Sequence, residues 1–326
     1  MASFGEPASF ASSPPARAAT FPLARHPELP VRARRLQFSA SQLSTYEECP
    51  RKWFFRYVCA AVDEQTSGAA TYGTAFHAAL EDFHAEVIRP HEVPEDVMRN
   101  RLAGALNAAF ERFGGLFPSR LEAELSRRRA LRTARHYVTW LVERARKSPF
   151  EVVACEHEVH LDVEGFAFIG FIDRIDRDLV SGNVTLIDYK TGNIAEDAAT
   201  YRAKIAEGKD FQLPFYYWAQ SAAGERVASI ALVPLKDDRA PIVPLELDVV
   251  FGDAPAARAR VKDRTGVVSV NVLERARSRM IELCRRIALA PSERFLAATD
   301  PQACTYCSYR VSCRERPPAA ESKWAH

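Results

Sequence analysis

The 326-residue sequence contains no apolar run that approaches the roughly 18 to 20 residues needed to span a bilayer. Its first residues also lack the continuous apolar stretch of a secretory signal. Seven cysteines are too few, and too odd in number, to indicate a disulfide framework in a chain of this length. These absences favour a cytoplasmic protein in a reducing compartment over a membrane or secreted protein.

The composition that remains is that of an ordinary globular protein. Apolar residues make up 47% and charged residues 26% of the chain, and the formal net charge is +2. A chain with this apolar content buries one large core or two modest ones. Residues 1–36, by contrast, are rich in Ala, Pro, Ser and Arg without any apolar period, so we expect a disordered leader there. The folded domain is expected over residues 37–316, and residues 317–326 are expected to form a tail.

Hydrophobic periodicity predicts a group of helices followed by a run of strands. A capped helix is expected after Ser39 or Ser41, with an interruption at Pro50. The later helices are expected at 73–89, 95–113, 119–147, 196–206, 211–222 and 267–289, and the strands at 151–163, 166–176, 184–190, 226–235 and 243–250. Glu164-Gly165 is expected to turn a hairpin. This order predicts a mixed α/β fold, in which a mixed sheet is flanked by helices and residues from about 90 to 148 form a helical insertion.

Polar side chains follow two apolar strands. Asp188 and Lys190 stand two residues apart at the end of the strand VTLI, so both side chains emerge on the same side. Asp173 lies at the end of another apolar run and can reach Asp188. Two carboxylates bind a hard divalent cation, and an adjacent ammonium suits phosphodiester hydrolysis, which passes through a strongly anionic transition state. A D-x-K tripeptide alone is more often a solvated ion pair, so Asp173 is the residue that favours a site.

Four short motifs in this order resemble those of a known family. The motifs are GTAFHAALE (73–81), GFIDRID (170–176), IDYKTG (187–192) and QLPFY (212–216). Over about residues 38–316 the chain resembles the RecB-like branch of the PD-(D/E)XK nuclease superfamily. The resemblance implies a restriction-endonuclease-like fold with Mg²⁺ or Mn²⁺ bound by His77, Asp173 and Asp188. In that family the two aspartates act in catalysis with a lysine that assists attack, here Lys190.

Three further residues complete the expected site. Glu81 follows His77 by one helical turn and can orient the imidazole. Gln212 and Tyr216 are spaced i, i+4 and offer an amide and a hydroxyl to DNA, although an amphipathic helix alone accounts for such a pair. An imidazole ligand would let the site accept Mn²⁺ readily.

Four cysteines match a second pattern of the same family. In its AddB, CRISPR-adaptation and exonuclease V members, one cysteine before the first motif and three after the last bind a 4Fe-4S cluster. The resemblance assigns this role to Cys49, Cys304, Cys307 and Cys313, whose cluster would join the N-terminal and C-terminal segments. Four thiolates also suit Zn²⁺, which stays the lesser alternative. Cys59, Cys155 and Cys284 are expected to pack in the interior.

The implied function is a metal-dependent DNA exonuclease of repair or recombination that acts on single strands or frayed ends, with an inclination toward 5′ polarity. A CRISPR spacer-processing nuclease and a non-catalytic DNA-end-binding scaffold are the alternatives. No G-x-x-x-x-G-K-[ST] motif is present, so the chain is not expected to power strand separation itself. A separate helicase, recombination or CRISPR protein is therefore the expected partner.

Charge and aromatic residues give two candidate DNA contacts. The segment 119–147 holds nine Lys or Arg against three Glu, a net +6 in a chain whose total is +2. The run 51–57 mixes aromatic and basic residues. Each can contact single-stranded DNA, and each is also explained by a solvated face or an aromatic core. We expect the helix charges to serve binding in part and the aromatic residues to be mostly buried.

Overall fold

The computed structural model describes residues 37–61, 67–252, 263–289, 295–305 and 307–313. The expected leader (1–36) and tail (317–326) lie outside the described residues. Every described residue belongs to one unit, which spans 35–326.

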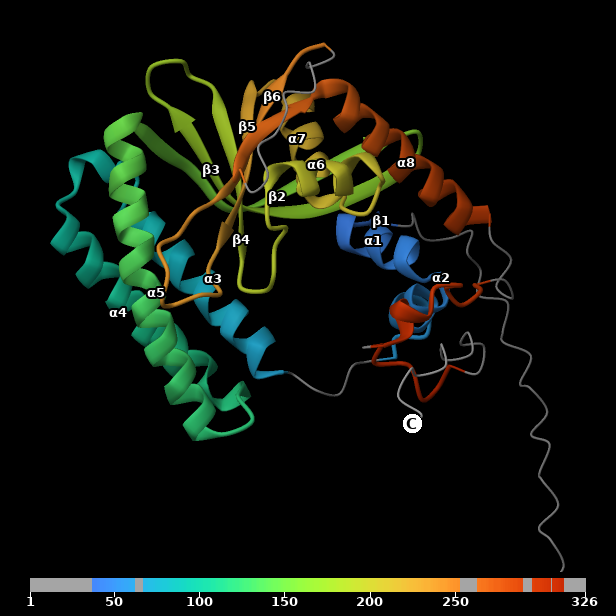
Figure 1. Cartoon of the computed structure of the whole chain (residues 1–326), viewed down its shortest axis with the longest axis horizontal. Helices are drawn as coiled ribbons and strands as arrows, with labels where there is room; N and C mark the ends of the chain where they lie inside the picture. Colours follow the sequence, from blue (N-terminus) through green and yellow to red (C-terminus); the bar gives the residue numbers. More distant parts are fainter. Residues whose placement is uncertain (1–36, 62–66, 253–262, 290–294, 306, 314–326) are drawn as a thin grey trace, which may run out of the picture. The chain divides into compact units, whose positions relative to one another are not determined.

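A seven-stranded mixed sheet forms the centre of the fold (Figure 1). Its order is β1-β3-β4-β5-β6-β7, and β2 pairs with β3. Three pairs are parallel, namely β1–β3, β4–β5 and β6–β7, and the other three are antiparallel. The strands are β1 (Gln37–Phe38), β2 (Phe150–Val163), β3 (Phe166–Asp178), β4 (Val184–Lys190), β5 (Val227–Pro234), β6 (Leu245–Val250) and β7 (Thr265–Ser269). The predicted mixed α/β fold is confirmed.

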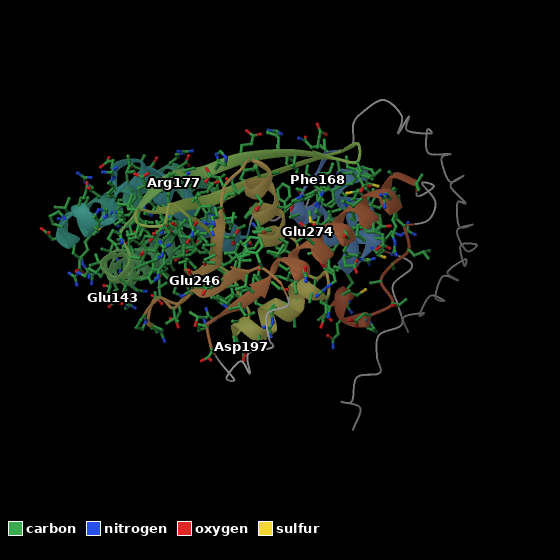
Figure 2. All side chains as sticks on the ribbon, turned by 90° about the horizontal axis from the view of Figure 1, so that it is seen from above. Glu143, Phe168, Arg177, Asp197, Glu246 and Glu274 are labelled. Carbon is green, nitrogen blue, oxygen red and sulfur yellow. The ribbon has the colours of Figure 1, made fainter. Side chains whose placement is uncertain are left out.

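The longest strands, β2 and β3, form the predicted hairpin. Its turn residues Glu164 and Gly165 have φ angles of 52° and 84°, and a two-residue hairpin turn of this kind requires positive φ at both positions. Figure 2 shows Phe168 and Arg177 well apart along β3. Pairing continues from Val163–Phe166 at the turn to Phe150–Asp178 at the far end.

Helices cover both faces of the sheet because successive side chains of a strand point to opposite faces. On β4, Leu186 packs in the apolar cluster of α1 (Ala40–Glu48), α6 (Ala198–Ala206), α7 (Gln212–Ala222) and α8 (Val270–Leu289). Its neighbour Ile187 packs in the cluster of α3 (Gly68–Glu86), α4 (Glu95–Phe113) and α5 (Arg120–Lys147). Figure 1 shows these two groups of helices apart. Residues 90–148, the expected helical insertion, contain α4 and α5, which pack in this layer together with α3.

Local signals place several element ends correctly. Ser39 caps α1, with its Oγ accepting from the backbone N of Gln42 at 3.2 Å. Pro50 begins α2 (Pro50–Trp53), where its missing N–H leaves no helical bond unmade. Gly114 follows the last residue of α4, as predicted. The remaining short elements are η1 (Phe54–Val58), η2 (Pro90–Glu92), η3 (Gly114–Leu116) and η4 (Pro301–Cys304).

The main differences from the prediction concern β7, β1 and the start of α3. The helix expected at 267–289 begins at Val270, because residues 265–269 form β7 and pair in parallel with β6. This run contains Val267 and Val268, whose branched side chains suit a strand. Strand β1 was not predicted, because its two residues are too few to show the alternation of apolar and polar residues that indicates a strand. Helix α3 begins five residues earlier than expected, since Ser67 caps it.

Candidate metal centre

The end of β4 presents Asp188 and Lys190 together, as the two-residue spacing predicts. Asp188 is only 1% exposed, and its Oδ2 lies 2.6 Å from Lys190 Nζ. The ion pair is therefore largely removed from water, unlike the solvated pair that a D-x-K tripeptide usually forms.

Helix α7 holds this pair through Gln212. Gln212 Nε2 donates to Asp188 Oδ1 at 2.6 Å and to the Tyr216 hydroxyl at 2.9 Å. Gln212 Oε1 accepts from Lys190 Nζ at 2.7 Å. The amide orientation is unambiguous because an ammonium only donates and a carboxylate only accepts. Gln212 and Tyr216 thus contact the ion pair itself, whereas the sequence suggested contacts to DNA.

A second group lies where α3 meets the β2–β3 hairpin. His77 Nδ1 is 3.7 Å from Asp173 Oδ2 and 3.6 Å from Glu156 Oε1. One ligand atom from each of these three residues lies within 4.8 Å of the other two. Asp173 Oδ2 also accepts from the backbone N of Tyr189 at 2.6 Å, which ties it to β4 between Asp188 and Lys190. An imidazole nitrogen and two carboxylates fit a divalent ion such as Mn²⁺ or Mg²⁺.

Glu156 is the site residue that the sequence reasoning missed. Cys155 pairs with Arg174 and His157 with Ile172, so Glu156 lies opposite Asp173. The turn at 164–165 predicts this register, because residues whose numbers sum to 329 face each other. Two carboxylates opposite each other in an antiparallel pair repel, and Glu156 also has a φ of 44°, which is strained for a residue other than glycine. A bound cation would offset the repulsion, and backbone strain of this kind concentrates at functional sites.

The pKa values reflect this crowding of charge. Burial, and then the charge of Asp188, raises the pKa of Asp173 to about 7. Burial alone would lower the pKa of His77, but the nearby carboxylates of Glu156, Asp173 and Asp188 raise it. Burial also opposes the charge on Lys190, yet Asp188 raises the pKa of that ammonium. The donor set therefore carries excess negative charge that a divalent cation would neutralise.

The structure gives His77 a different carboxylate neighbour from the expected one. Glu81 is exposed and lines a cavity together with His77 and Glu156. Within the described part of the chain, the carboxylates that lie against His77 Nδ1 are those of Glu156 and Asp173. Glu156 therefore occupies the place that the sequence reasoning gave to Glu81.

Two motif glycines allow the four motifs to pack together. A Cβ on Gly170 would lie 2.6 Å from the Phe215 ring, so a side chain there would force α7 away from β3. A Cβ on Gly73 would lie 3.0 Å from Thr191 Oγ1. Segments far apart in sequence meet at these glycines, which brings His77, Asp173 and Asp188 to one place.

The four cysteines of the expected cluster lie on two segments that meet. Cys49 Sγ accepts from the backbone N of Ala298 at 3.3 Å, and the Tyr309 hydroxyl donates to the carbonyl of Ala61 at 2.8 Å. Burial, and then the charges of Cys49, Cys307 and Cys313, raise the pKa of Cys304. The thiols are thus within electrostatic range, although in the described residues only His77, Glu156 and Asp173 form a compact ligand group.

Packing of the other three cysteines is confirmed only in part. Cys284 is buried and Cys155 half-buried, and burial raises the pKa of these thiols to about 12 and about 11. Cys59 is exposed, so the prediction that it packs in the interior was wrong. It follows η1, at the edge of the described segment 37–61.

The basic helix uses much of its charge within the protein. Five of its nine cationic residues have contacts to other side chains or carbonyls: Arg127 and Arg128 with Glu124, Arg132 with Asp238, Arg144 with Asp176, and Arg129 with the carbonyl of Lys236. Three of these contacts tie α5 to β3 or to the segment after β5. The charge of this helix therefore has a structural role that the sequence did not reveal.

The aromatic residues after Cys49 were expected to be mostly buried, and this is confirmed only for Trp53, since Phe54, Phe55 and Tyr57 are half-buried. Trp53 is 5% exposed, and its ring centroid lies 5.3 Å from that of Phe295. Phe54 stacks on Phe295 at 5.2 Å, and Phe55 lies 5.5 Å from Tyr309. These rings pack the N-terminal helices against the C-terminal segment.

The chain was compared with protein families, curated proteins and solved structures, and a family model matches most of it. The family model of the PD-(D/E)XK nuclease superfamily matches residues 37–314. No curated protein matches the chain. Among solved structures, the crystal structure of SSO0001 is similar at 16% identity and a TM-score of 0.34, over 86% of this chain and 87% of that one. Within the described residues, no helix is long and apolar enough to cross a membrane.

Proposed function

Because the chain belongs to the PD-(D/E)XK nuclease superfamily, we propose that it is a metal-dependent DNA exonuclease of repair or recombination. The observation that carries this proposal is the convergence of His77, Asp173, Asp188 and Lys190 from one helix and two strands. No residue of the family's motif set is replaced, which argues against a non-catalytic scaffold. A CRISPR spacer-processing nuclease would use the same site and differ in its partners.

The chain's own residues divide the work of hydrolysis. His77, Asp173 and Glu156 would hold a Mg²⁺ or Mn²⁺ ion next to Asp188, and such an ion activates water and neutralises developing charge. Lys190 stays protonated at neutral pH, because Asp188 raises its pKa. It therefore acts as a fixed positive charge for the anionic transition state and not as a base. Gln212 Oε1 accepts a hydrogen bond from Lys190 Nζ and thereby fixes the direction of the ammonium group.

Replacement of Asp188 by asparagine tests the proposed centre. Asp188→Asn removes a charge beside the metal site while keeping the side-chain shape, so Mg²⁺- or Mn²⁺-dependent cleavage should be lost while DNA binding persists. Asp96→Asn, at an exposed position in the first turn of α4, is the matched control. The assay uses single- and double-stranded DNA labelled at either end, which also reports preference and polarity. Cleavage by Asp188→Asn at the wild-type rate would refute this centre.

We further propose a 4Fe-4S cluster bound by Cys49, Cys304, Cys307 and Cys313. Three of these thiols fall within ten residues of sequence, and the fourth lies on the segment that packs against them. Zn²⁺ is the lesser alternative, since four thiolates suit either. The cluster would hold the N-terminal and C-terminal segments together. A separate helicase or recombination protein would supply the unwound DNA.

A further inference from the structure

A cavity of about 560 Å³ opens directly beside the proposed metal ligands. It lies between α3, the end of α4 and the β2–β3 hairpin, and its walls include His77, Glu81, Arg112, Phe113, Glu156 and Phe171. Its size is within the range of pockets that bind small organic molecules. Because His77 and Glu156 belong to both sites, an occupant of the cavity would touch the substrate atoms next to the metal.

Two aromatic rings line this cavity; Phe113 packs in part against the cluster of α3, α4 and α5, whereas Phe171 is largely uncovered. Phe171 is 48% exposed and precedes Asp173 by two residues on β3. Its partner across the hairpin is Glu158, which is also exposed, so no apolar neighbour on β2 covers the ring. Phe113 ends α4 and is half-buried, and the Arg112 guanidinium lies 4.7 Å from its ring. Exposed aromatic rings beside a polar site are typical of ligand contacts.

The charge of the cavity selects against a phosphate. Glu81 and Glu156 supply two carboxylates, against one guanidinium from Arg112. With His77 and Glu156 engaged at the metal, Glu81 and Arg112 leave the cavity without excess positive charge for a phosphate, whereas a neutral aromatic ring would stack on Phe171. Of the parts of a DNA strand, only the nucleobase is neutral, flat and aromatic.

We propose that this cavity binds one unpaired nucleobase of the strand whose phosphate lies at the metal centre, with Phe171 as its stacking surface. The inference rests on the proposed nuclease function and names its substrate class. A base inside a duplex must leave its stack and its partner to enter the cavity, which disfavours binding of duplex DNA. A single strand or a frayed end avoids that cost. Selection of unpaired DNA would then arise at Phe171, next to the reacting phosphate.

Binding of oligonucleotides with single abasic sites tests the inference on the wild-type protein. Fluorescent single strands carry the abasic site at each position in turn from the end, and affinity is measured in Ca²⁺ to limit cleavage. One position should weaken binding by roughly 5- to 100-fold, the range expected for loss of one stacked base. Equal affinity at every position would overturn the inference.

Variants of Phe171 then identify the stacking surface. Phe171→Ala should weaken binding of intact single strands by a similar factor, and it should bind the sensitive abasic strand about as well as wild type does. Phe171→Trp should retain wild-type affinity, which a merely structural role of the phenylalanine would not predict. Phe251→Ala, at a phenylalanine that is 82% exposed, is the matched control and should change nothing. If Phe171→Ala and the abasic site each weaken binding and their effects on affinity add, Phe171 is not the surface on which that base stacks, and the assignment is overturned.

Failure of this inference is distinguishable from failure of the proposed function. If wild type cleaves DNA with Mg²⁺ or Mn²⁺ but shows no position-dependent abasic effect, the nuclease proposal stands and the base pocket is rejected. If wild type neither binds nor cleaves DNA under any condition of the assay, both are rejected.

Discussion

At the scale of single residues, the environment of Lys190 decides its chemistry. Its Nζ lies 2.6 Å from Asp188 Oδ2 and donates to Gln212 Oε1 at 2.7 Å. These two acceptors stabilise the charged form, so the pKa of Lys190 is raised although the side chain is mostly buried. A charge held in this way needs no reorganisation when the anionic transition state forms.

Lys190→Ala should therefore lower kcat on single-stranded DNA by on the order of 10²- to 10³-fold, the loss typical of one preorganised electrostatic group. Single-turnover cleavage with saturating enzyme measures the effect. Lys209→Ala removes an exposed lysine that pairs only with Glu207 among the described residues, and it serves as the control. A loss of less than a few-fold would remove Lys190 from the mechanism.

At the scale of elements, a buried polar network joins both helical and strand parts of the site. Arg174 on β3 is fully buried and donates through one nitrogen to His84 of α3, Tyr137 of α5 and Tyr189 of β4. Its other terminal nitrogen donates to Asp176 at 2.7 Å. Tyr189 stands between Asp188 and Lys190 in sequence, so this network positions the strand that carries them. Removing one partner of such a network leaves other groups unsatisfied, which is costly in a buried site.

His84 makes the stability of this network depend on pH. The carbonyl of Val87 only accepts, so His84 Nδ1 donates to it and Nε2 accepts from Arg174. Burial, and then the charge of Arg174, hold the pKa of His84 well below its usual range. Below pH 6.5 the unfolded chain therefore binds a proton that the folded protein excludes, and stability falls as the pH falls. Each pH unit in that range costs about 1.4 kcal/mol.

Urea denaturation of metal-free protein at pH 7.5, 6.5 and 5.5 measures this effect. His84→Gln does not titrate, so its free energy of unfolding should lose about 1 kcal/mol less than that of wild type between pH 6.5 and 5.5. His160→Gln, at an exposed histidine, should keep the wild-type slope. Equal slopes for all three proteins would contradict the assigned protonation state of His84.

At the scale of the whole molecule, the two ends of the described chain close on each other. In Figure 1 the helices α1 and α2 lie beside the C-terminal segment that contains η4. The backbone N of Arg51 donates to the carbonyl of Leu296 at 3.1 Å, and Phe54 stacks on Phe295. Bringing the ends of so long a segment together costs chain entropy on folding, and a cluster across the same junction would lower that cost by restricting the unfolded chain.

Cys307→Ser should accordingly lower the iron content and the visible absorption of protein purified without oxygen, and it should reduce the thermal unfolding midpoint. Iron and sulfide analysis with differential scanning fluorimetry measures both properties. Cys59→Ser alters an exposed thiol outside the proposed set and is the control. Wild-type protein that contains zinc and no iron would replace the proposed cluster by a zinc site.

The sequence alone determined the features that depend on neighbours in the chain. Strand alternation predicted that Asp188 and Lys190 meet, the turn at Glu164 and Gly165 set the hairpin, and the four motifs identified His77 and Asp173. Each of these follows from backbone geometry within a few residues or from motif order.

Only the tertiary structure decided which distant groups share a site. It placed Glu156 beside His77, turned the amide of Gln212 onto Asp188, and assigned three arginines of α5 to partners outside that helix. These contacts join segments that lie far apart in the chain, where local periodicity carries no information on distance. Close packing decides such distances, as at Gly170, where a Cβ would lie 2.6 Å from the Phe215 ring.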